Sequence, residues 1–160
     1  MEGYGAGVLL RAVVPDDVPI FFAHQSDPEA SAMAAFPSRD YDAHVAHWTN
    51  KILANETGFV RTIEVDGQVA GNVLSWEADG RRFVGYWIGR DFWGRGIATR
   101  ALAEFLDQVV AERPLHALVA RHNVGSIRVL EKCGFVRVAE DDEEVTLELP
   151  ATAQTGPPRP

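Results

Sequence analysis

The strongest restriction on the fold is a run of three strand-like segments in the middle of the chain. They cover residues 58–65, 68–76 and 82–88, and Asp-Gly pairs separate them at 66–67 and 79–80. Glycine tolerates positive φ, which tight hairpin turns require, so an Asp-Gly pair between two such segments favours a hairpin. We therefore expect an antiparallel meander of three consecutive strands.

Helical patterns flank the meander. After a β-branched strand over 8–14, a helix with a proline near its first turn is expected over about 15–24. The helical signal is broken over 27–37, and Asp40 is a suitable N-cap for a second helix over 40–54. Apolar residues at spacings of three and four predict a long amphipathic helix over 97–110.

The remaining segments complete an α/β (α+β) protein. Residues 115–120 are typical of a short buried strand, and 123–132 of a helix that ends at Gly134. A final hairpin is expected from 135–138 and 145–149. These patterns together predict six to seven strands and about four helices.

Size and composition favour a single domain. The chain has 160 residues and 46% of them are hydrophobic, which is enough for a sizeable core. We expect one domain over 1–150 and a disordered, proline-rich tail over 151–160. Cys133 is the single cysteine, so an internal disulfide and a thiol-rich zinc site are excluded.

Charge restricts the partners. The formal net charge of −8 argues against nucleic acid, because a phosphate backbone requires a concentrated basic surface. The acidity suits a cationic acceptor, but it also keeps a protein soluble. The chain shows no signal-peptide pattern at its start and no apolar run of membrane-spanning length, so a cytoplasmic location without membrane contact is expected.

The stretch from Gly89 to Thr99, Gly-Arg-Asp-Phe-Trp-Gly-Arg-Gly-Ile-Ala-Thr, lies between a strand and an amphipathic helix. Unpaired N–H groups and the helix dipole favour an anion there. A Walker loop would require Lys and then Ser or Thr after Gly94, where Arg95-Gly96 stand. A dinucleotide fingerprint would require Gly or Ala in place of Thr99 and a parallel βαβ unit. A glycine-rich turn before a packed helix is the alternative without a ligand.

Residues 93–98, Trp-Gly-Arg-Gly-Ile-Ala, resemble the pyrophosphate loop of the GNAT acetyltransferase superfamily. The family pattern is Gln or Arg, two residues, Gly, one residue, and then Gly or Ala. Gly96 and Ala98 match it, whereas Trp93 departs from its polar first residue. Backbone N–H groups do most of the binding in such a loop, so the loop is still expected to hold a pyrophosphate.

A second segment strengthens the resemblance. Residues 121–135 look like the other cofactor segment of the family, with Asn123 three residues before Ser126 and a helix that ends in Gly-Phe. Three short segments resemble the branch that includes ribosomal-protein N-terminal acetyltransferases: 27–29, 36–37 and 86–89. Kinship at the level of the fold does not fix the acceptor.

The resemblance implies a GNAT fold, in which the two middle strands of a mixed, mostly antiparallel sheet splay apart. These strands correspond to 82–88 and 115–120, and the pantetheine arm of acetyl-coenzyme A would lie in the gap between them. The implied cofactor-binding residues are Trp87, Ile88, Gly89, Trp93, Gly94, Arg95, Gly96, Ile97, Ala98, Thr99, Asn123 and Ser126. No metal is expected, because His44 and His47 lack a clear third ligand.

The implied reaction is acetyl transfer from acetyl-coenzyme A to a primary amine by direct attack in a ternary complex. A backbone N–H near Trp87 or Ile88 would stabilise the oxyanion. Many relatives have an acidic tyrosine where Leu130 stands, so Ser126 is the expected proton donor; a serine that satisfies its own helix turn is the alternative. Glu77 is a candidate base acting through water, or simply an exposed carboxylate, and the base is left open.

The acceptor-binding side chains are expected to be Phe36, Trp48, Trp76 and Tyr86, although aromatic residues on a helix face more often belong to the core. The acceptor itself is left open between a protein N-terminus and a small-molecule amine. A homodimer is compatible with the resemblance, because relatives often pair. The absent tyrosine motivates one alternative function, a non-catalytic acyl-coenzyme A sensor of the same fold.

Overall fold

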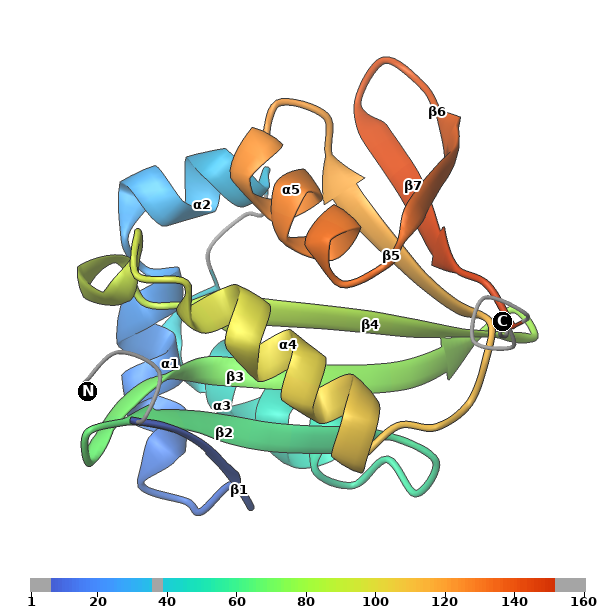
Figure 1. Ribbon diagram of the computed structural model, residues 1–160. Coiled ribbons are helices and arrows are strands. Elements are labelled where there is room, and N and C mark those ends of the chain that lie inside the picture. Colours follow the sequence, from blue (N-terminus) through green and yellow to red (C-terminus); the bar gives the residue numbers. More distant parts are fainter. Residues whose placement is uncertain (1–6, 36–38, 152–160) are drawn as a thin grey trace.

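The computed structural model describes residues 7–35 and 39–151, and its centre is one sheet (Figure 1). The described residues form seven strands in the order β1-β2-β3-β4-β5-β7-β6. The strands are β1 (Val8–Arg11), β2 (Phe59–Val65), β3 (Gln68–Ala78), β4 (Arg81–Ile88), β5 (Leu115–Ala120), β6 (Val136–Glu140) and β7 (Glu144–Leu149). All neighbours are antiparallel except β4 and β5. The expected mixed, mostly antiparallel sheet is confirmed.

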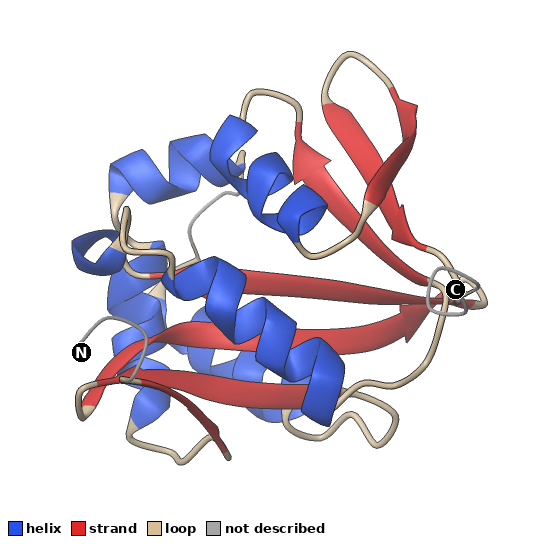
Figure 2. Cartoon of the chain, in the orientation of Figure 1, coloured by secondary structure: helices blue, strands red, loops and turns tan. Residues whose placement is uncertain are grey.

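Helices cover both faces of this sheet (Figure 2). The described residues form α1 (Asp17–Gln25), α2 (Pro28–Ala34), α3 (Tyr41–His47), α4 (Ile97–Gln108) and α5 (Val124–Lys132), with a π-helical turn η1 (Trp48–Ile52) and a 3-10 turn η2 (Arg90–Phe92). The larger core includes α4 and α5, and a smaller core includes α1 and η1. No helix within the described ranges is long and apolar enough to cross a lipid bilayer.

The two Asp-Gly turns form as the sequence predicts. Asp66 and Gly67 have φ values of 51° and 84°, and Asp79 and Gly80 have values of 53° and 76°. Two consecutive residues with positive φ match the twist of the strands on either side of a tight hairpin. The turns therefore place β2, β3 and β4 side by side in a meander.

The parallel strands β4 and β5 touch at one end only. Along their length, the recorded pairs are Arg82 with Leu115 and Phe83 with His116. Beyond them the strands diverge, so β4 runs on toward Ile88 without β5 beside it (Figure 1). The splay implied by the resemblance is therefore present, with a closed end at the two pairs and an open end near Ile88.

The helix α2 corrects the expectation of a broken region over 27–37. The Asp27 carboxylate caps the helix by accepting the N–H groups of Glu29 and Ala30 at 2.9 and 3.4 Å. Pro28 occupies the first turn, where a missing N–H costs nothing. The Asp-Pro pair is therefore the start of a helix rather than an interruption.

Asp17 fixes the junction between β1 and α1. Its carboxylate is 2% exposed, pairs with Arg11 at 2.8 Å and accepts hydrogen bonds from the Val14 N–H at 2.9 Å and the Thr62 hydroxyl at 2.7 Å. These contacts turn the chain away from the sheet. As a result, β1 ends at Arg11 and does not continue to residue 14 as expected.

Candidate active site

A cavity of about 530 Å³ lies at the open end of the gap between β4 and β5. Its walls come from the end of β4, the loop before α4, the first turns of α4 and α5, and α2. The expected cofactor-binding residues that line it are Trp87, Ile88, Trp93, Gly94, Gly96, Ile97, Ala98, Thr99, Asn123 and Ser126. The structure thus brings together the two segments that the sequence singled out.

The glycine loop before α4 presents its backbone to this cavity. Gly94 and Gly96 have φ values of 77° and 74°, and a Cβ at either position would meet no atom within 4 Å. Within the described part of the chain, the N–H groups of residues 94–99 have no recorded protein acceptor. Consecutive free N–H groups at a helix N-terminus form a concave site for an anion such as a phosphate.

Gly89 and Arg95 do not line the cavity. The Gly89 N–H donates to the Ala70 carbonyl at 2.8 Å, and a Cβ at Gly89 would lie 2.6 Å from the His24 ring. The Arg95 guanidinium lies over the ring of Phe92, 5.1 Å from its centroid. Both residues therefore support the loop from outside rather than facing the space inside it.

The bond from Gly89 to Ala70 also shows which way the end of β4 faces. Successive N–H groups of a strand point to opposite sides in the plane of the sheet. Because the Gly89 N–H points toward β3, the Ile88 N–H points toward β5 and the open gap. Of the two expected oxyanion donors, Trp87 and Ile88, the geometry therefore selects Ile88.

Trp93, which departs from the family pattern, is tied to the same strand end. Its indole N–H donates to the Ile88 carbonyl at 2.9 Å, and the side chain remains 38% exposed at the cavity wall. The indole therefore holds the last peptide of β4 in place. The sequence motif alone does not reveal this role.

Tyr86 and Ser126 meet across the gap. Their hydroxyl oxygens are 2.6 Å apart, and both residues line the cavity. The Asn123 side chain caps α5 by accepting the Ser126 N–H at 3.2 Å. Burial raises the pKa of Tyr86 to about 12, although the hydrogen bond with Ser126 acts in the opposite direction. The phenol is therefore protonated at every physiological pH.

The helix α2 forms the wall that the sequence did not predict. Its residues Ala30, Met33 and Ala34 line the cavity. The other lining residues that the sequence analysis missed are Phe92, Gly125, Val129 and Lys132. The N-cap signature Asp27-Pro28 was the available signal for α2, and the spacing of three between Ser126 and Val129 was a signal for a shared helix face.

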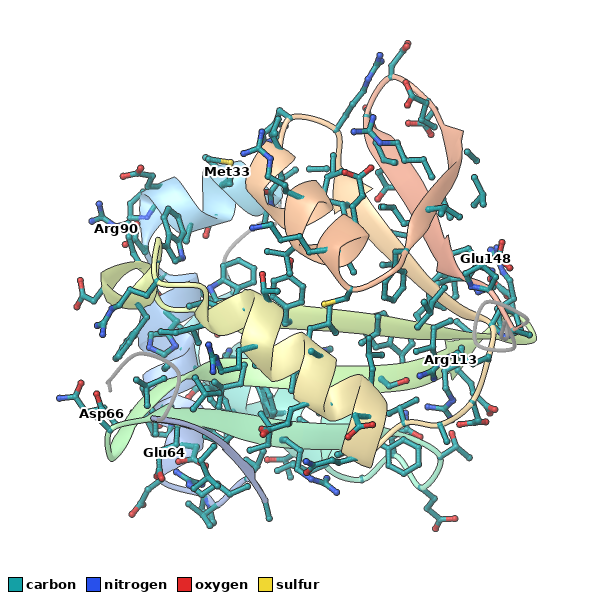
Figure 3. All side chains as sticks on the ribbon, viewed as in Figure 1. Met33, Glu64, Asp66, Arg90, Arg113 and Glu148 are labelled. Carbon is teal, nitrogen blue, oxygen red and sulfur yellow. The ribbon has the colours of Figure 1, made fainter. Side chains whose placement is uncertain are left out.

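Two polar side chains from other parts of the chain, Arg90 and His122, contact α2 and its N-cap. Arg90 pairs with Asp27 at 2.5 Å and with Glu29 at 3.0 Å, and His122 Nε2 lies 2.9 Å from the Ala32 carbonyl. The loop after β4 and the loop after β5 are thereby joined to the same helix. Figure 3 shows Met33 and Arg90 on the side of the open gap, with Arg113 and Glu148 at the opposite side.

The structure does not bring Glu77 to the cavity. Glu77 pairs in register with Arg82 at the closed end of the splay, and its carboxylate lies 3.7 Å from the Arg82 guanidinium. Six residues of strand separate Arg82 from Ile88, which is about 20 Å at 3.3 Å per residue. The side chain is 53% exposed, so it is a surface carboxylate at the hairpin.

Of the three expected acceptor-binding residues that the structure describes, Tyr86 alone lines the cavity. Trp76 stacks on Phe83 at the closed end, with 6.0 Å between ring centroids. Trp48 is 2% exposed and packs against Phe21 in the smaller core, as helix-face aromatics commonly do. Phe36 lies outside the described residues.

The histidines and Leu130 have structural surroundings. His44 is fully buried and its Nε2 lies 3.1 Å from the Val18 carbonyl. No group of three or more potential metal ligands occurs among the described residues. Leu130 is 1% exposed in the larger core, which explains why an apolar residue is accommodated there. Cys133 is partly buried, and burial raises its pKa, so it is a poor nucleophile.

A second hollow, of about 790 Å³, adjoins the C-terminal end of α2. Ala34 borders both cavities. The second is lined by three neighbouring carboxylates, Asp142, Glu143 and Glu144, for which no ion pair is recorded with a described residue. Arg121 also lines it but is paired with Glu140 at 3.2 Å.

Known proteins share this architecture. An N-acetyltransferase called p20 from Bacillus licheniformis is 27% identical over 82% of this chain and 80% of its own length. RimL, a ribosomal-protein alpha-N-acetyltransferase solved with coenzyme A, has a TM-score of 0.73 at 16% identity, covering 91% of this chain and 95% of that one. AAC(6')-Ib solved with paromomycin and acetyl-coenzyme A has a TM-score of 0.75 at 16% identity, covering 91% and 94%.

A family model supplies the assignment. The model of the acetyltransferase (GNAT) domain matches residues 8–136, which is most of the chain. The match includes the glycine loop, the splayed strands and all of α5. The chain therefore belongs to the GNAT acetyltransferase family.

Proposed function

We propose that this protein transfers an acetyl group from acetyl-coenzyme A to a primary amine. The observation that carries the proposal is the set of free N–H groups at residues 94–99 beside the gap between β4 and β5. The diphosphate of the cosubstrate would bind the N–H groups, and its long thioester arm would lie in the gap. Coenzyme A bound to RimL and acetyl-coenzyme A bound to AAC(6')-Ib, proteins of the same fold, are consistent with this reading.

The residues of the chain would hold acetyl-coenzyme A at three places. The N–H groups of residues 94–99 would bind the pyrophosphate. The Asn123 side chain uses its oxygen to cap α5, so its amide N–H groups are available to the pantetheine arm. The Ile88 N–H would donate to the thioester oxygen, and a dry gap would strengthen that bond.

The transfer would then proceed by direct attack. The lone pair of the neutral amine forms the new carbon–nitrogen bond, and the carbon–sulfur bond breaks with its electron pair on sulfur. The Ser126 hydroxyl would donate a hydrogen bond to the departing sulfur and stabilise the thiolate. The extra proton on the nitrogen passes to water. With Glu77 at the closed end, we propose that water takes this proton directly.

The second hollow is the proposed approach for the acceptor. Its unpaired carboxylates would attract a protonated amine and raise its local concentration. Ala34 borders both cavities, so an acceptor in this hollow would lie close to the thioester. Because the sequence segments resemble the ribosomal-protein branch, basic protein N-termini are the first acceptors to test, and small polyamines the second.

The test has two steps. Calorimetry with coenzyme A should detect binding, and thiol release from acetyl-coenzyme A should depend on an added amine from a panel of N-terminal peptides, polyamines and neutral amines. Higher turnover with cationic amines at low salt is expected from the carboxylates. Binding without turnover on any amine would favour the sensor function instead, and no binding would refute both.

A further inference from the structure

The contact between Tyr86 and Ser126 joins two parts of the chain that the fold holds apart. Tyr86 lies on β4, three residues beyond the last β4–β5 pair at Phe83, and Ser126 lies in the first turn of α5. Their hydroxyls are 2.6 Å apart, at the wall of the cavity. This hydrogen bond therefore spans the gap two residues before Ile88, the proposed donor to the thioester oxygen.

The chemistry of the pair sets the direction of the bond. A phenol is a stronger acid than an alkyl alcohol, so Tyr86 is the better donor and Ser126 the better acceptor. The other acceptor near the phenol, the Ser126 carbonyl, is 3.4 Å away and forms a weaker bond. With Tyr86 donating, the hydrogen of the Ser126 hydroxyl is left for another acceptor in the cavity.

We infer that Tyr86 is a positioning residue that orients the Ser126 hydroxyl as a donor to the sulfur of coenzyme A. This inference rests on the proposed function, since it requires the thiol to reach Ser126. Tyr86 neither gives nor takes a proton in the reaction. Its hydrogen bond keeps the hydrogen of the Ser126 hydroxyl directed at the sulfur. The pair thereby takes the place of the acidic side chain that is absent at Leu130.

The surroundings suit a permanent donor. Burial raises the pKa of Tyr86 to about 12, so the phenol does not ionise in the range where thiols do. The titratable neighbours are Cys133, which follows the last residue of α5, and Lys132, which lines the cavity. Any test that varies pH must separate the bound thiol from these two groups.

Comparison of coenzyme A with desulfo-coenzyme A provides that separation, because only the former has a thiol. A donor at the sulfur favours the thiolate and lowers the pKa of the bound thiol below that of free coenzyme A. A shift of one unit makes coenzyme A bind about tenfold more tightly as pH rises from well below the pKa of the bound thiol to well above that of the free thiol. Desulfo-coenzyme A should show no such gain.

The variants Tyr86→Phe and Ser126→Ala should each abolish most of this gain, measured by calorimetry across pH. In turnover assays, Tyr86→Phe should lower kcat about tenfold with KM for acetyl-coenzyme A unchanged, and should have no further effect in the Ser126→Ala background. Tyr41→Phe, an exposed tyrosine on α3, is the matched control and should behave as wild type.

The outcomes separate the two ideas. A pH-dependent gain that persists in Tyr86→Phe, or that is missing from the wild type, overturns the inference even if amines are acetylated. A gain in affinity that depends on both hydroxyls supports the inference even if no amine is turned over. The absence of turnover would refute the acetyl transfer but not the role of Tyr86. If coenzyme A does not bind, both fall. Ser126→Ala truncates a partly exposed helix residue and keeps the test valid if Tyr86→Phe is unstable.

Discussion

Gly96 combines a conformation and an empty space that only glycine provides. Its φ of 74° is left-handed, and its missing Cβ leaves open the concave surface of free N–H groups. We expect Gly96→Ala to weaken coenzyme A binding at least tenfold, because the methyl group would enter the space of the phosphate. Calorimetry with coenzyme A measures this loss.

Gly80 provides a control for the backbone strain alone. It has a φ of 76°, and a Cβ there would also meet no atom within 4 Å, but it lies in the turn between β3 and β4. Gly80→Ala and Gly96→Ala should each lose about 1 kcal/mol of stability in urea denaturation, the cost of a left-handed non-glycine residue. Equal loss of coenzyme A affinity in both variants would contradict a phosphate site at residue 96.

Asp17 makes stability depend on acid. Burial opposes its ionisation, but the hydrogen bonds from Arg11, the Val14 N–H and Thr62 outweigh burial and lower its pKa. The unfolded chain, with a pKa of about 3.9, then binds the proton more readily, so stability present above that pH is lost as pH falls toward the folded value.

Replacement of Asp17 by Asn should remove this dependence. We expect Asp17→Asn to be about 2 kcal/mol less stable at neutral pH, because Arg11 loses one of its two charged partners and keeps Glu64. Between pH 5 and pH 3 the variant should lose less stability than the wild type, because the carboxylate that gains the proton is no longer there. Denaturation midpoints across that range provide the measurement. Parallel curves for both proteins would show that Asp17 is not the acid-sensitive group.

Individual residues differed in how far the sequence revealed them. The glycines at 94 and 96 belong to a local motif, and the motif was enough to place them at the cavity. The bond of Trp93 to Ile88 and that of Tyr86 to Ser126 depend on how distant segments meet, so residue types alone did not predict them. Glu77 and Trp76 were selected for their chemistry, and the register of β3 carries both to the closed end.

At the scale of elements, α2 is a short helix held by its ends. Arg90 pairs with Asp27 and Glu29 at the start, and His122 contacts the Ala32 carbonyl near the end. Surface ion pairs contribute little to global stability, but they restrict local motion. We expect Arg90→Ala to leave the Tm nearly unchanged and to accelerate amide exchange over residues 28–34.

Arg137 offers the matched comparison. It forms a similar exposed pair with Glu131, at 3.2 Å, between β6 and α5. Arg137→Ala should leave exchange over residues 28–34 at the wild-type rate. If both variants accelerate exchange there equally, the Arg90 pair does not hold α2.

Most elements were predictable because each has a local signature. The Asp-Gly turns gave β2, β3 and β4, and apolar spacing gave α4. The helix α2 was missed because Pro28 was read as a helix breaker, although the first turn is the one place where proline suits a helix. The end of β1 was missed because the buried Asp17 sets it. Asp17 is held there by a hydrogen bond from Thr62, a residue that is distant in the sequence.

At the scale of the whole molecule, a bound coenzyme A would contact several elements at once. The cavity wall includes β4, α2, α4 and α5. A ligand that binds only the folded state at 100 times its Kd adds about 2.7 kcal/mol of stability. For a chain of this size we expect coenzyme A to raise the Tm by about 5 to 10 °C in a thermal shift assay.

Pantetheine, which lacks the diphosphate, is the control for this rise in Tm. Pantetheine without the nucleotide diphosphate should raise the Tm far less at the same concentration, because it cannot use the N–H groups of residues 94–99. Equal shifts with both ligands would show that the diphosphate is not what the loop binds.

The splay between β4 and β5 has a further consequence for a protein that awaits its ligand. Among the described residues, β4 pairs with β3 at Tyr86 and Ile88 but with no strand on its other side, so this part of β4 is an edge within the sheet. Unpaired edges invite other strands to add to them. When coenzyme A is scarce, this edge would therefore be open to strand addition and self-association. Coenzyme A bound in the gap would cover the edge and so reduce aggregation.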